Sequence, residues 1–198
     1  MNVTIDYYNK NAAVYSADTV GVDFSATQKK FLEYLPPYAK ILDFGCGSGR
    51  DTKYFLSKGF FVDAMDGSES LCRIARRYTG ITVKHMFFDE LVAKDKYDGI
   101  WACASILHLP WDELLVVLHK MADALKKDGV IYTSFKYGDF SGERNGRFFT
   151  DFTEKRLFEM LAEVPELVCR EYWISMDVRP NRSEEKWMNS ILSRKVAH

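Results

Sequence analysis

The stretch at residues 41–51 decides the fold, and it reads Ile41-Leu42-Asp43-Phe44-Gly45-Cys46-Gly47-Ser48-Gly49-Arg50-Asp51. An apolar segment typical of a buried strand leads past an acid into three glycines at alternate positions. Glycine has no Cβ and tolerates a positive φ, so such a loop turns sharply and leaves room for a bound molecule. The pattern predicts a ligand-binding loop between a strand and a helix that begins near Arg50.

The spacing of the glycines narrows the choice of ligand. A dinucleotide fingerprint places its third glycine five residues after the first, where it eases helix packing beside a pyrophosphate. Here Arg50 holds that position, and the third glycine, Gly49, comes one residue earlier. The spacing therefore disfavours a dinucleotide.

A second acid ends the next apolar segment. After a helix expected at 51–58, the strand-like run 60–65 leads into Asp66-Gly67-Ser68. An acid at this point of a strand–helix–strand unit accepts hydrogen bonds from ribose hydroxyls. The alternative role for Asp66 is to cap the helix expected at 68–79, but Ser68 fits that role better. We therefore expect Asp66 to bind a ribose.

Strand-like and helix-like segments alternate along the chain, which is typical of a parallel sheet covered on both faces. The pattern predicts a doubly wound, Rossmann-like α/β fold. The expected strands lie at 40–44, 60–65, 81–87, 97–102 and 130–135, and the expected helices at 6–17, 25–35, 51–58, 68–79 and 112–125. A polar, glycine-bearing stretch at 136–147 then precedes a helix at 152–162 and extended segments at 167–176 and 187–195.

Composition sets the outer limits. A chain of 198 residues with 47% hydrophobic content can bury one core, so we expect a single domain over 1–198. Its parts would be an N-terminal helical lid (1–38), a cofactor-binding core (39–135) and a substrate-side part (136–198). With 27 basic and 28 acidic side chains, no nucleic acid partner is expected.

The sequence also indicates where the protein resides and in what state its cysteines are. No apolar stretch is long enough to span a bilayer and the N-terminus lacks a signal-peptide pattern, so we expect a cytoplasmic protein with no membrane partner. The four cysteines form no C-x-x-C pair and are expected to be reduced thiols. Neither they nor His85 and His119 have partners at metal-ligand spacing, so no metal is expected. The cysteines are Cys46, Cys72, Cys103 and Cys169.

The glycine loop resembles motif I of the class I S-adenosylmethionine (SAM)-dependent methyltransferases. From about Tyr8 to the C-terminus, the chain is similar to bacterial members of the methyltransferase type 11/12 group, tellurite-resistance-like relatives included. The resemblance implies a seven-stranded sheet completed by an antiparallel C-terminal hairpin, with SAM as cofactor and S-adenosylhomocysteine as product. The segments that carry it are 41–51, 62–68, 87–91, 97–110, 125–138, 146–151 and 177–189.

The resemblance also implies which residues hold SAM. The acid near motif I faces the methionine end in the family, a role that falls to Asp43 or Gly45. The strand-two acid, Asp66, would bind ribose, and Phe88 with Asp89 would hold the adenine. The full expected cofactor set is Asp43, Gly45, Cys46, Gly47, Gly49, Asp66, Gly67, Ser68, Phe88, Asp89, Cys103 and Tyr8.

Methyl transfer from a sulfonium needs alignment, desolvation and sometimes a base for the acceptor proton. His108 follows the fourth strand, at the sheet edge where open α/β folds bind ligands, and is the candidate catalytic residue, as a general base or an acceptor-orienting group. A histidine satisfied by the backbone in the turn before Pro110 is an equal alternative. Tyr8 and Tyr15 are candidates for an aromatic lid over SAM, or else pin their helix to the core.

Basic residues mark the expected acceptor side. The guanidinium group binds carboxylates and phosphates through a planar donor fork, which favours a small anionic or aromatic acceptor. The alternative is that these residues are surface charges paired with neighbouring Asp177, Glu184 and Glu185. The expected substrate-binding residues are Lys136, Arg147, Arg179 and Arg182.

Two other functions fit parts of the pattern. A SAM-binding regulatory or interaction protein without methyl transfer would carry the same cofactor motifs. An NAD-dependent oxidoreductase is disfavoured by the glycine spacing and by the lack of a Tyr-x-x-x-Lys pair after the fourth strand.

Overall fold

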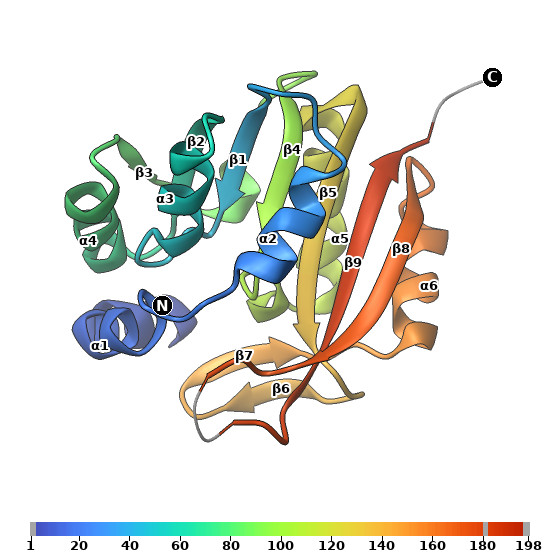
Figure 1. Ribbon diagram of the computed structural model, residues 1–198. Helices are drawn as coiled ribbons and strands as arrows, with labels where there is room; N and C mark the ends of the chain where they lie inside the picture. Colours follow the sequence, from blue (N-terminus) through green and yellow to red (C-terminus); the bar gives the residue numbers. More distant parts are fainter. Residues whose placement is uncertain (1–2, 180–181, 196–198) are drawn as a thin grey trace.

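A seven-stranded sheet runs through the centre of the computed structural model, which describes residues 3–179 and 182–195 (Figure 1). Its strand order is β3-β2-β1-β4-β5-β9-β8. Pro180 and Asn181, within one of the segments that carry the resemblance, lie outside the described residues. The strands are β1 (Lys40–Phe44), β2 (Phe61–Asp66), β3 (Val83–His85), β4 (Tyr97–Ala102), β5 (Leu125–Lys136), β8 (Leu167–Met176) and β9 (Lys186–Arg194).

The pairing pattern confirms the predicted fold. Strands β1 to β5 pair in parallel, whereas β9 runs antiparallel to both β5 and β8. The doubly wound core thus ends in the expected C-terminal hairpin. Helices connect the strands: α1 (Val3–Thr19), α2 (Ser25–Leu32), α3 (Arg50–Ser57), α4 (Glu69–Thr79), α5 (Trp111–Ala124) and α6 (Glu154–Glu163), with 3-10 turns η1 (Phe88–Glu90) and η2 (Ile106–His108).

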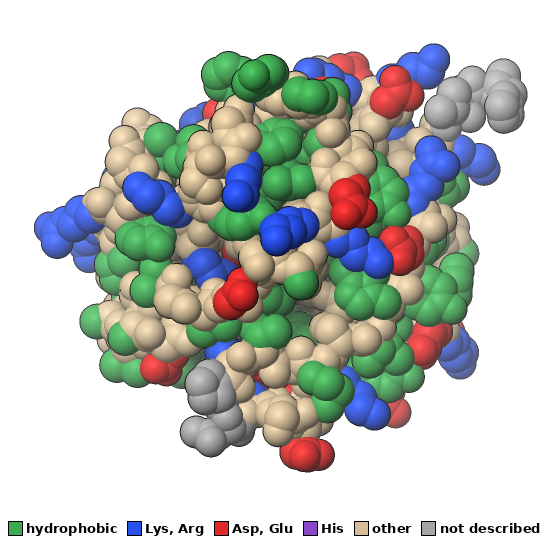
Figure 2. All heavy atoms as spheres, viewed as in Figure 1, with side chains coloured by type: hydrophobic (Ala, Val, Ile, Leu, Met, Phe, Trp, Pro, Cys, Tyr) green, Lys and Arg blue, Asp and Glu red, His purple; other side chains and the backbone are tan. Residues whose placement is uncertain are grey.

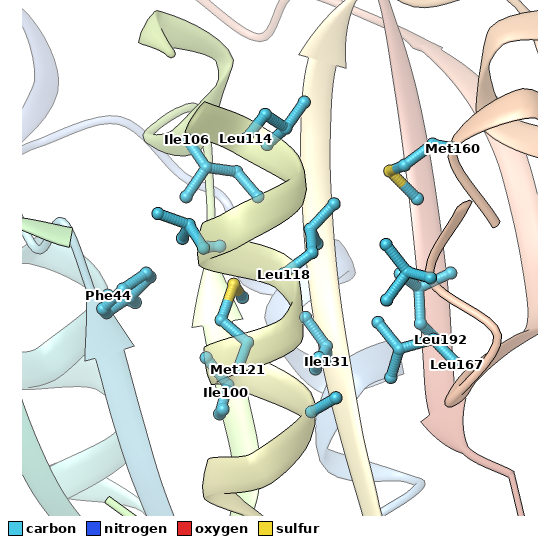
Figure 3. Close-up of a cluster of buried hydrophobic side chains, with 14 of the residues drawn as sticks. Phe44, Ile100, Ile106, Leu114, Leu118, Met121, Ile131, Met160, Leu167 and Leu192 are labelled. Carbon is cyan, nitrogen blue, oxygen red and sulfur yellow. The ribbon is translucent and has the colours of Figure 1, made fainter. Parts of the chain in front are cut away.

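Successive side chains along each strand point to opposite faces of the sheet, so each face has its own hydrophobic core. On β4, Ile100 points to one face and Trp101 to the other, and both are fully buried. Ile100 packs with Leu118 and Met121 of α5 (Figure 3). Trp101 stacks on Tyr132, with ring centroids 4.0 Å apart, beneath α2 and α3. Because helices cover both faces of the sheet, a ligand can reach the parallel strands only at their ends.

The stretch 136–147, predicted as a polar loop, contains most of a β-hairpin instead. Strands β6 (Ser141–Arg144) and β7 (Arg147–Thr150) pair across Asn145 and Gly146. Both turn residues have positive φ, 52° and 74°, as a two-residue hairpin turn requires. The Asn-Gly pair was therefore the signal that the sequence interpretation overlooked.

Several predicted boundaries were wrong. The third strand covers only Val83–His85, and α2 ends at Leu32, three residues before the expected stop. The sequence predicts that Asp128-Gly129 closes the helix expected at 112–125, but Leu125 is already extended and pairs with Tyr97 across an irregular register, so both residues lie within β5. Tertiary pairing therefore overrides the local helix-stop signal.

The fold brings two distant segments to the edge where the parallel strands end. Helix α1 and the β6–β7 hairpin lie side by side below that edge (Figure 1), and the Phe148 amide donates to the Thr4 hydroxyl at 3.0 Å. Together they cover the end of the sheet at which the glycine loop lies. No helix in the described part of the chain is long and apolar enough to cross a membrane.

Candidate functional site

The glycine loop has the backbone that its sequence predicts. Gly45, Gly47 and Gly49 have φ values of 86°, 56° and 89°. A Cβ on Gly45 would lie 2.5 Å from the Cβ of Ser105, far inside van der Waals contact. The amides of Gly45 and Cys46 both donate to the Met65 carbonyl, at 3.0 and 2.9 Å. The loop is thus held close to strand β2 with no room for a side chain at Gly45.

Asp66, at the end of β2, tethers this loop. Its two carboxylate oxygens accept from the Gly47 amide at 2.9 Å and the Ser68 amide at 2.8 Å. Burial raises the pKa of Asp66, while these two hydrogen bonds oppose the rise. A carboxylate has about four acceptor positions, so Asp66 keeps capacity for further donors such as ribose hydroxyls.

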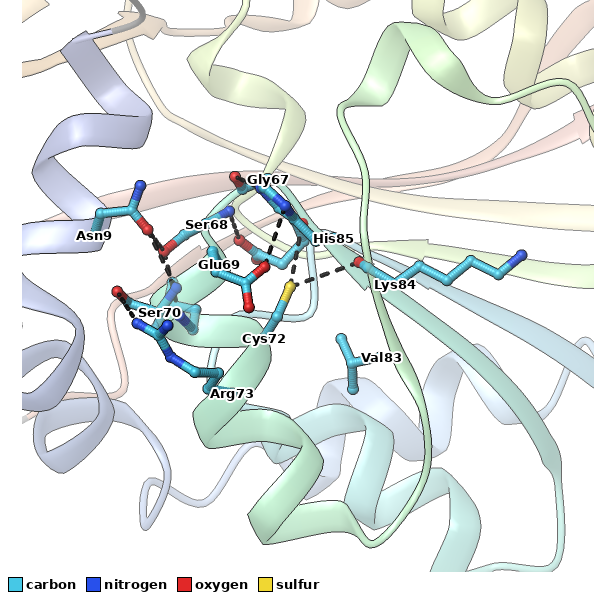
Figure 4. Close-up of polar contacts among 12 residues, drawn as sticks. Asn9, Gly67, Ser68, Glu69, Ser70, Cys72, Arg73, Val83, Lys84 and His85 are labelled. Carbon is cyan, nitrogen blue, oxygen red and sulfur yellow. Dashed lines mark hydrogen bonds and ion pairs between the residues drawn. The ribbon is translucent and has the colours of Figure 1, made fainter.

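Ser68 caps α4, as the sequence predicts. Its hydroxyl accepts from the Leu71 amide at 3.2 Å and donates to the side chain of Asn9 at 2.8 Å. Asn9 also accepts from the Ser70 amide at 3.2 Å, so helix α1 is fastened to this corner (Figure 4). Because Ser68 supplies the cap, Asp66 is left for the loop and for a ligand.

A first cavity of about 480 Å³ opens beside Asp66. The glycine loop and Asp66 form one wall, and the residues after β3 form another. Helices α1 and α5 close it. From the expected cofactor set it is lined by Tyr8, Gly45, Gly47, Asp66, Gly67, Phe88 and Asp89.

A second cavity, of about 130 Å³, lies on the other side of the glycine loop. It is lined by Cys46 and Cys103 of the cofactor set and by all four expected substrate residues. Helix α1, the β6–β7 hairpin and the β8–β9 connection contribute to its walls, together with the start of α3 and the segment after β4. Five residues line both cavities, so the two cavities meet at them: Tyr8, Tyr15, Gly45, Ala104 and His108.

Tyr8 and His108 form a hydrogen-bonded pair at this junction. The His108 Nδ1 lies 2.6 Å from the Phe148 carbonyl, which can only accept, so Nδ1 carries the ring proton. The Nε2 atom is then an acceptor, and the Tyr8 hydroxyl, 2.8 Å away, donates to it. Burial lowers the pKa of His108 to about 4. The nearby charges of Arg147 and Arg144 also lower this pKa, whereas the hydrogen bond to Phe148 raises it.

The basic residues around the second cavity differ in their partners. Arg179 makes an ion pair with Asp177 through Nε at 2.9 Å and Nη2 at 2.5 Å. Lys136 and Arg182 both contact Glu185. Arg147 alone of the four has no carboxylate partner among the described residues. Arg179 is thus paired with Asp177, which is the alternative role that the sequence left open for these basic residues.

Three expected cofactor residues lie outside both cavities: Asp43, Gly49 and Ser68. Asp43 accepts from the Thr52 hydroxyl at 2.5 Å beneath the start of α3. Burial and the neighbouring Asp51 carboxylate raise the pKa of Asp43. Gly49 lies against α4, where a Cβ would be 2.7 Å from Thr79. These residues support the loop, and of the two candidates for the methionine end only Gly45 lines a cavity.

Several cavity residues went unnoticed in the sequence. Ser105 packs against Gly45 and donates to the Phe44 carbonyl at 2.6 Å, and Phe87 and Val117 complete the first cavity. Ser105 lies in the same post-β4 segment as His108, which was the available signal. Nothing local marks Val117, because it also fits the apolar face of α5.

The four cysteines are free thiols. Within residues 3–179 and 182–195, no three His, Cys, Asp or Glu side chains form a group that could hold a metal ion.

Comparisons with known proteins agree with this geometry. Residues 41–129 match the model of a methyltransferase domain family. A solved 1,6-didemethyltoxoflavin N1-methyltransferase from Burkholderia thailandensis, with 1,6-didemethyltoxoflavin and S-adenosylhomocysteine bound, is 21% identical; the match covers 97% of this chain and 85% of that one, with a TM-score of 0.76. A TehB-like SAM-dependent methyltransferase from Corynebacterium glutamicum is 21% identical over 96% of this chain and 98% of its own, with a TM-score of 0.71.

Other similar structures carry other activities. The cyclase SpnF is 12% identical, over 87% of this chain and 81% of its own, with a TM-score of 0.69. At such identities the structural likeness shows the fold. The comparison with curated proteins found no match. The family match covers the glycine loop, Asp66 and the residues after β3, so residues 41–129 carry a methyltransferase domain, and the solved methyltransferase with S-adenosylhomocysteine bound supports SAM as the cofactor.

Proposed function

We propose that this protein transfers the methyl group of SAM to a small-molecule acceptor bound in the second cavity. The observation that carries the proposal is the junction of the two cavities at Tyr8, Gly45 and His108. Adenosine in the first cavity would put the sulfonium at this junction. An acceptor in the second cavity would then face the methyl group.

The roles within the first cavity follow from its walls. Asp66 would accept from the ribose hydroxyls, since its carboxylate is fixed by two backbone amides. Phe88 and Asp89 would hold the adenine, and Gly45 would let the methionine end approach the backbone. When bound, SAM supplies a methyl group on a sulfonium for in-line displacement. The protein's own contribution is alignment and the exclusion of water, which can provide most of the rate.

His108 would act as an orienting residue. A base needs a pKa near the working pH to be effective, and the pKa of His108 is lowered to about 4. Its neutral imidazole instead fixes the direction of the Tyr8 hydroxyl at the junction. We therefore favour an acceptor that needs no strong base from the protein.

Size and charge support a small acceptor. The second cavity measures about 130 Å³ and is roofed by the hairpin and α1, which leaves little room for a polymer. Lysine and arginine side chains are interspersed with acidic ones over the face in Figure 2, with no continuous basic surface there. The Burkholderia enzyme, which binds 1,6-didemethyltoxoflavin, offers a precedent on this fold.

A labelled-methyl assay tests the proposal. Protein with methyl-labelled SAM would be given a library of small aromatic and carboxylic molecules, and S-adenosylhomocysteine release would be measured against an acceptor-free control. We expect stimulated release by at least one class of acceptor. Tight binding of S-adenosylhomocysteine with only background release across the library would favour the alternative, a SAM-binding protein without methyl transfer.

A further inference from the structure

Arg147 lies at the start of β7, on the wall of the second cavity. Its guanidinium carbon is 4.5 Å from the Tyr7 ring centroid and 5.1 Å from that of Phe149. Its Nη1 is 3.4 Å from the Tyr8 hydroxyl. The Nε atom is buried and has no hydrogen-bond partner among the described residues. Aromatic rings thus hold this cation in place without neutralising it.

Every other cation on the second cavity has a carboxylate partner. Arg50 pairs with Asp51 at 2.8 Å, Arg179 pairs with Asp177, and Lys136 and Arg182 share Glu185. Arg147 makes no ion pair within the part of the chain that the structure describes. A partly desolvated cation without a counter-ion is costly, and a bound anionic ligand would supply the missing charge.

We propose that the acceptor carries a carboxylate and that Arg147 binds it, an inference that rests on the function proposed above. The planar guanidinium donates two parallel hydrogen bonds to a carboxylate, which an amide or amine cannot accept equally well. The cavity also presents the rings of Tyr8, Phe149 and Trp187. The favoured acceptor is thus a ring that bears a carboxylate.

The carboxylate of SAM itself is the competing anion. Arg50 and Tyr15 lie next to the glycine loop, where a Cβ on Gly47 would be 3.2 Å from the Tyr15 ring. Arg147 comes from the hairpin and contacts the ring of Tyr7 and the hydroxyl of Tyr8. This places Arg147 on the hairpin side of the junction, which favours the acceptor as its ligand.

Calorimetry with two matched probes tests the inference. Protein saturated with S-adenosylhomocysteine would be titrated with benzoate and with benzamide, which share a ring and differ in charge. We expect benzoate to bind at least about tenfold more tightly, as a charged hydrogen bond implies. Arg147→Gln should abolish this preference, and Arg147→Lys should retain part of it. Arg77→Gln, which removes the same charge from an exposed position on α4 outside both cavities, should keep it.

Three results would overturn the inference. They are equal affinity of benzoate and benzamide in the wild-type protein, a preference for benzoate that survives in Arg147→Gln, and a loss of S-adenosylhomocysteine affinity of tenfold or more in Arg147→Gln. The last would assign Arg147 to the cofactor's carboxylate. A cooperative urea unfolding transition like that of the wild-type protein reports that the variants are folded. Failure of the wild-type protein to bind S-adenosylhomocysteine would instead contradict the proposed function.

Discussion

The two cavities that meet at Tyr8 and His108 are built in different ways. The first depends on backbone: the glycine loop allows close approach, and one carboxylate, Asp66, is fixed by two amides. The second depends on side chains from α1, the β6–β7 hairpin and the β8–β9 connection, and most of its charges pair with one another. The first therefore tolerates little change, whereas the second can change its ligand through single side chains.

Because the two cavities are built differently, substitutions at one should affect a different property from substitutions at the other. Changes beside the first cavity should weaken S-adenosylhomocysteine binding, and changes around the second should leave that affinity intact. The predictions below are ordered from the largest expected effect to the smallest.

Gly45→Ala should have the largest effect. The left-handed conformation costs about 1–2 kcal/mol for a residue with a Cβ, and the clash with Ser105 adds about 1–3 kcal/mol. We expect S-adenosylhomocysteine affinity to fall by more than about a hundredfold, measured by calorimetry. Gly21→Ala is the matched control, because a Cβ there meets nothing within 4 Å. Unchanged affinity in Gly45→Ala would show that the loop is not the cofactor site.

Asp66→Ala should weaken S-adenosylhomocysteine by about ten- to a hundredfold, since a hydrogen bond to a charged acceptor contributes about 1.5–3 kcal/mol. Asp63→Ala serves as the control on the same strand, because Asp63 pairs with Lys40 and Lys96 instead of lining a cavity. Equal affinities in the two folded variants would remove Asp66 from the ribose site.

The Asp177 ion pair should stabilise the second region without affecting the cofactor. Despite burial, Arg179 holds the pKa of Asp177 at about 2, below its usual 3.8. Because the folded-state pKa is the lower one, the stabilisation is complete above about pH 4 and is lost as the pH falls towards 2. Relative to Asp177→Asn, wild-type protein should lose about 2 kcal/mol of unfolding free energy between pH 5 and pH 2.

Urea unfolding at several pH values measures this difference. A difference between the two proteins that stays flat with pH would mean that the pair contributes nothing. A changed S-adenosylhomocysteine affinity in Asp177→Asn at neutral pH would contradict the claim that the second region does not affect cofactor binding.

Tyr8→Phe should have the smallest effect, a loss of about 1 kcal/mol of unfolding free energy, because it removes the neutral hydrogen bond to His108 and only a long contact, 3.4 Å, from Arg147. An NMR titration of the imidazole sharpens the test, since His108 should take up its proton near pH 4 in the wild-type protein. Protonation near pH 6.5 would return His108 to the role of general base.

Features set by local sequence were predictable. Residues close in sequence determine the glycine loop, Asp66 at the end of β2 and the Ser68 cap. The alternation of strands and helices is also local, and the strand order confirms the fold that it predicts. The Asn145-Gly146 turn was equally local but was read as part of a loop.

Features set by long-range contacts were not predictable. Asp43 was one of two candidates, with Gly45, for the methionine end of SAM, but its side chain accepts from Thr52 under α3. Arg147 and Arg179 had the same sequence signal, and only the fold separates the free cation from the paired one. Contacts between segments distant along the chain decide which side chains have partners. Composition and motif spacing do not predict these contacts.

A crystal structure of the complex with S-adenosylhomocysteine tests the central claim most directly. The account predicts ribose hydroxyls on Asp66, adenine beside Phe88 and Asp89, and the sulfur at the junction of Tyr8 and His108, facing the second cavity. Adenosine in the second cavity, or a sulfur turned away from Arg147 and the hairpin, would contradict the assignment of cofactor and acceptor to the two cavities.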